Sequence, residues 1–96
     1  MAPAEIEDVV LRVMRTLNLA RAPQAQIEVS REAALFAPGS PLDSLGLVSL
    51  LIDIEEALGE RGVEVTLSDA RAMSPARSPF RSVPALVDYI HQLIAT

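Results

Sequence analysis

The most informative stretch of this sequence is residues 44–59, SLGLVSLLIDIEEALG. Successive residues of an α-helix are rotated by about 100°, so residues three, four and seven apart share a face. One apolar set repeats at these spacings and predicts the buried stripe of a helix from Ser44 to about Gly59. Gly59 and Gly62 are the residues at which we expect this helix to stop. The predicted buried stripe consists of Leu47, Leu50, Leu51, Ile54 and Leu58.

Three further apolar residues of this stretch form a second stripe, about a third of a turn from the centre of the first. They are Leu45, Val48 and Ile52, and Glu55 and Glu56 flank them at the far end. A helix packed on one side needs only one apolar stripe. The second is therefore either covered by the long loop that precedes the helix or exposed as a binding surface. Acids beside exposed apolar residues suit a partner with a basic rim and an apolar centre.

The remaining side of this helix carries small and polar residues, and we expect it to face water. Its residues are Gly46, Ser49, Asp53 and Ala57. Asp53 and the nearby glutamates lack the loop-type spacing of a calcium site. We therefore predict no metal site here.

Apolar residues at helical spacing predict two further long helices. The first runs from about Ala4 to Asn18, after Pro3, which suits a first turn. The last runs from Val83 to about Ala95, with Ser82 as its N-cap. The expected buried residues are Ile6, Val9, Val10, Val13, Met14 and Leu17 in the first helix, and Val83, Leu86, Val87, Ile90 and Ile94 in the last.

Long connections join these helices. Residues 20–42 contain three prolines, and a loop of this length needs anchoring side chains, for which Leu35, Phe36 and Leu42 are the candidates. A short helix is predicted at Ser68–Met73, followed by a proline-containing loop. No segment alternates with period two for long enough to build a sheet. The prediction is a single all-α domain over residues 1–96, with three main helices, one short helix and a long first loop.

Composition limits the classes of function. The chain has 13 acidic and 8 basic residues and a net charge of −5, which argues against nucleic-acid binding and favours basic partners. It has no cysteine, which excludes disulfides, thiolate metal sites and a cysteine nucleophile. Acidic residues interrupt the apolar residues near the N-terminus, and no apolar run is long enough to span a membrane. The expected location is the cytoplasm.

Residues 41–48, PLDSLGLV, resemble the attachment motif of acyl carrier proteins and related carrier domains. In that family an Asp-Ser-Leu triplet opens the second helix of a four-helix bundle, and the serine carries a 4′-phosphopantetheine arm. The resemblance covers nearly the whole chain, including DIEEAL at residues 53–58 and DYI at residues 88–90. Without it, a serine at this position is read as a plain N-cap, although a helix N-terminus also favours a phosphate group.

The resemblance assigns roles to particular residues. It implies that Ser44 is the attachment site and that Asp43 contributes to recognition by the phosphopantetheinyl transferase. That enzyme would move the arm from coenzyme A to the Ser44 hydroxyl as a phosphodiester. The imported thiol would then hold cargo as a thioester, so the protein would be a carrier and not an enzyme. The partner-binding face implied by the resemblance consists of Leu45, Val48, Ile52, Glu55 and Glu56.

The expected partners are the transferase, an acyl- or aminoacyl-loading ligase, and pathway enzymes with basic docking patches. The carrier is expected to be a monomer. Val63, Val65, Met73 and Phe80 could line the region near the arm, although apolar residues of this kind are more often plain core.

The sequence departs from the carriers of fatty-acid synthesis in the residues after the serine, in a longer turn at residues 59–62 and in a basic loop at residues 77–81. Gly46 and Ser49 stand where those carriers usually have acids, which favours a specialised pathway such as polyketide-like, aminoacyl or D-alanyl loading. Peptidyl carriers rank second, because they more often have glycines before the serine. A different class of function also stays open: a helical interaction module that keeps the fold and is never modified.

Overall fold

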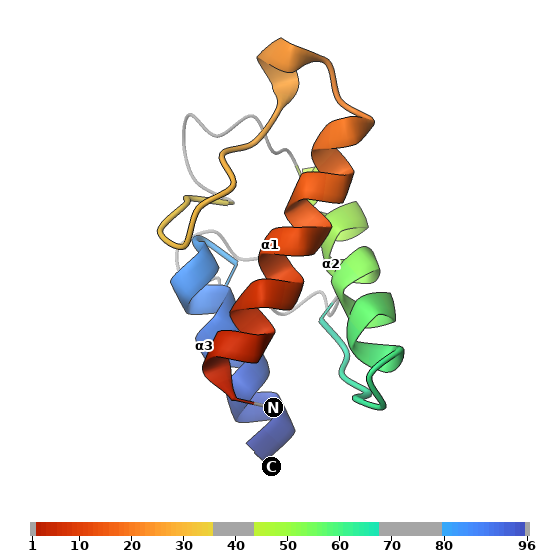
Figure 1. Cartoon of the computed structure of the whole chain (residues 1–96), viewed down its shortest axis with the longest axis vertical. Helices are drawn as coiled ribbons and strands as arrows, with labels where there is room; N and C mark the ends of the chain where they lie inside the picture. Colours follow the sequence, from red (N-terminus) through yellow and green to blue (C-terminus); the bar gives the residue numbers. More distant parts are fainter. Residues whose placement is uncertain (1, 36–43, 68–79, 96) are drawn as a thin grey trace.

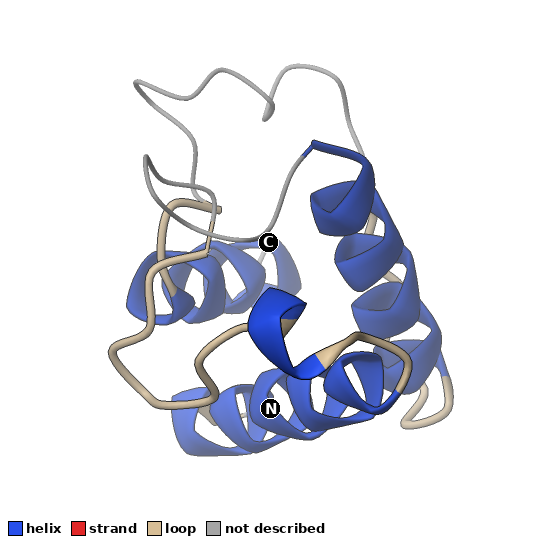
Figure 2. Ribbon diagram, turned by 90° about the horizontal axis from the view of Figure 1, so that it is seen from above, coloured by secondary structure: helices blue, strands red, loops and turns tan. Residues whose placement is uncertain are grey.

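Three α-helices and one short 3₁₀ turn make up the regular structure of this computed structural model, which describes residues 2–35, 44–67 and 80–95. The helices are α1 (Pro3–Leu19), α2 (Ser44–Gly59) and α3 (Val83–Ala95), and the turn is η1 (Pro23–Ala25) (Figure 1). Figure 2, seen from the η1 end, shows only helices and loops in the described part of the chain. The all-α prediction is confirmed for these residues. The predicted short helix at Ser68–Met73 lies outside them.

The ends of α1 and α3 follow from local chemistry. Pro3 occupies the first turn of α1, where a missing N–H costs no hydrogen bond, and the Ala2 N–H donates to the Glu5 carboxylate at 3.2 Å. At the start of α3, the Ala85 N–H donates to the Ser82 hydroxyl oxygen at 3.3 Å. Ser82 is thus the N-cap of α3, as predicted.

A glycine turn ends α2 and sends the chain back along it. Gly62 has φ 81°, in the left-handed region where a side chain would be strained. This geometry lets the Val63 N–H donate to the Leu58 carbonyl oxygen at 3.0 Å. Residues 63–67 then turn back toward α2 (Figure 1). The predicted stop at Gly59 is confirmed.

Helix α1 packs closely against both of the other helices, whereas the backbones of α2 and α3 do not approach each other as closely in the described chain. The predicted buried stripes of all three helices join in one core, with Leu17 and Ile94 half-buried at its edge. Side chains from the connections complete this core. They are Ile27, Ala33, Leu35, Leu67 and Phe80.

The described part of the first loop is tied to α1 and to the start of α3. The Asn18 side chain pairs with the backbone of Ile27 through two hydrogen bonds of 2.9 Å, one accepted and one donated. Further along, the Leu35 N–H donates to the Arg81 carbonyl oxygen at 2.9 Å, beside a bridge between Ala34 and Ser82. Leu35 is fully buried, so its anchoring role is confirmed. The other two expected anchors, Phe36 and Leu42, lie outside the described residues.

Candidate functional site

The candidate site begins where α2 begins. Ser44 is the first residue of α2, as the sequence predicted, and its side chain and Asp43 lie outside what the structure describes. The first backbone N–H groups of a helix have no partner within the helix, and together with the helix dipole they favour negative charge. The first turn of α2 contains no acidic residue that would oppose such a charge.

The second apolar stripe of α2 is exposed. We call Leu45, Val48 and Ile52 the exposed stripe. Leu45 is 76% exposed and Ile52 is 43% exposed, while Val48 is half-buried. All five residues of the buried stripe are 0% exposed on the same helix. Of the two explanations for a second stripe, the structure therefore favours an open surface over a covered one, and this surface starts beside Ser44.

The two glutamates that flank the exposed stripe have different surroundings. Glu55 is half-buried, and its Oε1 accepts a hydrogen bond of 2.5 Å from the backbone N–H of Leu67. Glu56 is exposed, and no hydrogen bond or ion pair joins it to the described residues. The sequence placed both on one partner-binding face, but within the described ranges only Glu55 has a hydrogen-bond partner.

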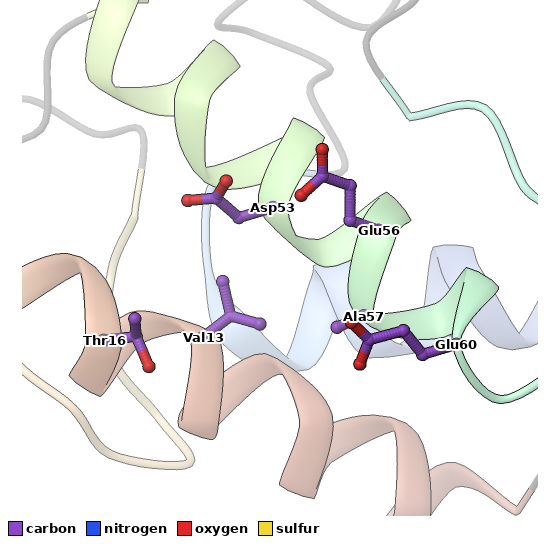
Figure 3. A pocket seen from close by; sticks show the side chains of 6 residues that line it. All are labelled: Val13, Thr16, Asp53, Glu56, Ala57 and Glu60. Atoms are coloured by element: carbon purple, nitrogen blue, oxygen red, sulfur yellow. The ribbon is translucent and has the colours of Figure 1, made fainter.

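A groove of about 250 Å³ runs between α1 and α2 (Figure 3). Its rim on α2 carries three carboxylates, and no hydrogen bond or ion pair to the described residues is found for any of them. Within the described ranges, no group of three or more His, Asp or Glu side chains could hold a metal ion. The groove is lined by Val13 and Thr16 of α1 and by Asp53, Glu56, Ala57 and Glu60 of α2.

The expectation that the small and polar residues on this side of α2 face water is wrong for Gly46 and Ala57, which are both half-buried. Ala57 was predicted to face water, but it is half-buried and packs against the core. The reason is α1, which lies beside α2 here and brings Val13 to the groove that Ala57 lines. Asp53, Glu56 and Glu60 lie together along this groove, as their spacing at i, i+3 and i+7 indicates.

The residues suggested for the region near an arm belong mainly to the core. Val63 and Val65 are half-buried against it. Phe80 is fully buried and makes an edge-to-face contact with Tyr89, with ring centroids 5.8 Å apart. Met73 lies outside the described residues. The plain-core interpretation therefore holds for the three that can be placed.

No helix in the described part of the chain has both the length and the apolar character needed to cross a membrane. No protein-family model matches the chain, and no curated protein or solved structure matches it. The case for a function therefore rests on the residues around Ser44 and on the sequence motif that contains it.

Proposed function

We propose that this chain is an acyl carrier protein. It carries acyl or related intermediates as thioesters on a 4′-phosphopantetheine arm attached to Ser44, and presents them to the enzymes of a biosynthetic pathway. The observation that carries the proposal is the position of the Asp43-Ser44-Leu45 triplet. Ser44 is the first residue of α2, and the next side chain, Leu45, is 76% exposed beside it.

The residues at the start of α2 fit a phosphodiester. The dipole of a 16-residue helix stabilises a negative charge on a group attached at its first residue, by roughly 0.3–1 kcal/mol. The first turn of α2 adds no carboxylate that would repel it. The bound arm supplies the thiol that holds the cargo, and the chain itself has no cysteine.

The exposed stripe is suited to docking a partner next to Ser44. Leu45 and Ile52 present apolar surface that a partner can remove from water, which contributes about 25 cal/mol per Å² of buried apolar area. Glu56 adds a negative charge at the edge of this surface. A partner with an apolar centre and a basic rim, such as the transferase or a loading enzyme, fits this arrangement.

Two alternatives stand beside this proposal: a carrier of a different cargo, and an interaction module that is never modified. Aminoacyl, D-alanyl or peptidyl cargo would use the same arm and the same serine, so it changes the pathway and not the chemistry of the site. An unmodified interaction module would use the exposed stripe alone, and the exposure of Leu45 and Ile52 supports it equally well. Modification of Ser44 separates the carriers from the interaction module.

The test is the intact mass of the protein after incubation with coenzyme A and a phosphopantetheinyl transferase of broad specificity. We expect the wild-type chain to gain one phosphopantetheine and Ser44→Ala to gain none. Ser49→Ala is the matched control, because it removes an exposed serine hydroxyl from the same helix. A wild-type chain that stays unmodified with several transferases contradicts the carrier proposal and favours the interaction module.

A further inference from the structure

Glu55 and Glu56 are adjacent on α2 and carry the same charge, but among the described residues a hydrogen-bond partner is found only for Glu55. Glu55 accepts the Leu67 N–H at 2.5 Å, whereas Glu56 is exposed and unpaired with respect to the described residues. We propose that Glu55 is a positioning residue: its carboxylate holds residues 63–67 against α2, and it does not act by presenting its charge to a partner.

The Leu67 N–H depends on Glu55 for its hydrogen bond. Leu67 is 0% exposed, and no backbone carbonyl of the described residues accepts its N–H. A buried N–H without an acceptor is strongly disfavoured, because it has lost its hydrogen bonds to water. The two residues are twelve positions apart in sequence. The turn at Gly62 brings them together by reversing the chain after α2.

Residues 63–67 are held at both ends. The Val63 N–H donates to the Leu58 carbonyl oxygen at the start, and the Leu67 N–H donates to Glu55 at the finish. Between these points Val65 is half-buried, while its neighbours Glu64 and Thr66 are exposed. The segment belongs to no sheet in the described chain, so these two hydrogen bonds and its apolar contacts fix its place.

A consequence for docking follows, and this step rests on the proposed function. If Glu55 acts as a hydrogen-bond acceptor for Leu67, an uncharged acceptor of the same shape can replace it. Glutamine keeps one acceptor oxygen, loses the negative charge and carries an NH2 group in place of the second oxygen. Glu56, which meets solvent, would act on a basic partner through its charge, and glutamine cannot replace that.

The first test measures amide hydrogen exchange at Leu67 by NMR in the unmodified protein. Glu55→Ala should speed the exchange by about 10- to 100-fold, the ratio expected for losing a hydrogen bond to a charged group. Glu55→Gln should restore most of the protection, and Glu56→Ala should leave it unchanged. The proposal is overturned if Glu55→Ala leaves Leu67 exchange unchanged, or if Glu55→Gln exchanges as fast as Glu55→Ala.

The second test compares the rates at which the transferase and coenzyme A modify Glu55→Gln and Glu56→Gln. We expect the wild-type rate for Glu55→Gln and a slower rate for Glu56→Gln. Equal slowing by both substitutions means that the partner reads the charge of Glu55, and it overturns the positioning proposal. If the wild-type chain is not modified at all, the proposed function fails, and the exchange at Leu67 still decides the role of Glu55.

Discussion

The two apolar stripes of α2 have similar side chains, but one is buried and the other is exposed. The buried stripe, from Leu47 to Leu58, is entirely enclosed, whereas the exposed stripe leaves Leu45 at 76% and Ile52 at 43% exposed. Leu51 and Ile52 are neighbours in sequence, so hydrophobicity does not separate them. Their angle around the helix does, because one side of α2 faces α1 and the core and the other faces solvent.

Because of this difference, one stripe contributes free energy to folding and the other can contribute it to binding. Burying a leucine or isoleucine side chain contributes roughly 1.5–3 kcal/mol. The buried stripe contributes that free energy to folding. The exposed stripe keeps much of it available for association with a partner. The described first loop does not cover the exposed stripe, since its hydrogen bonds lead to α1 and to the start of α3.

The largest expected effect is on the buried stripe. Ile54→Ala should lower the free energy of unfolding by about 2–5 kcal/mol, because it leaves a cavity among fully buried side chains. Urea denaturation followed by circular dichroism measures this change, and we expect one cooperative transition. Val48→Ala is the control from the exposed stripe and should cost much less. Equal losses for the two variants would mean that both stripes are core.

The next largest loss of stability is expected where the first loop is anchored to α1. Asn18→Ala removes both hydrogen bonds to the backbone of Ile27, which is buried. We expect the free energy of unfolding to fall by about 1–3 kcal/mol, the cost of unsatisfied buried backbone groups. Gln24→Ala, at an exposed position of the same loop, should have almost no effect. If the two variants unfold alike, Asn18 does not anchor the loop.

The smallest effect on stability is expected at the edge of the exposed stripe. Glu56→Arg should change the free energy of unfolding by less than about 0.5 kcal/mol, because the side chain is exposed. It should instead slow modification by the transferase, and the slowing should fade in high salt, because the screening length falls from about 8–10 Å at 0.1–0.15 M to about 3 Å at 1 M.

Glu64→Arg is the matched control for Glu56→Arg, since it makes the same charge change at an exposed position off α2. The measurement is the rate of modification by the transferase for each variant at a low and a high salt concentration. Identical rates for both would show that a partner senses only the net charge of the chain and not this face of α2.

Periodicity was enough to predict the helices and to separate the two stripes. The starts of α2 and α3, the stop at Gly59 and the N-cap at Ser82 all depend on local residues, which is why the sequence reveals them. The burial of Leu47 and the exposure of Leu45 depend only on their angle around one helix. Those predictions needed no knowledge of distant contacts.

Features that depend on chain reversal could not be predicted. Asn18 pairs with Ile27, and Glu55 with Leu67, only because a turn between them brings the partners together. Ala57 is half-buried because α1 lies beside it, and no pattern within α2 carries that information. For this reason the sequence analysis predicted the same partner-binding role for Glu55 and Glu56, although their surroundings in the structure differ.

The most direct test of this division of α2 makes two measurements on two adjacent residues. For Leu51→Ala and Ile52→Ala, we would determine the free energy of unfolding and, at a temperature where both variants are folded, the rate of coenzyme A-dependent modification. Leu51→Ala should lose about 2–5 kcal/mol of stability and keep the wild-type rate. Ile52→Ala should stay within about 1 kcal/mol of wild type and be modified more slowly. The account is contradicted if Ile52→Ala is as destabilised as Leu51→Ala and is modified at the wild-type rate.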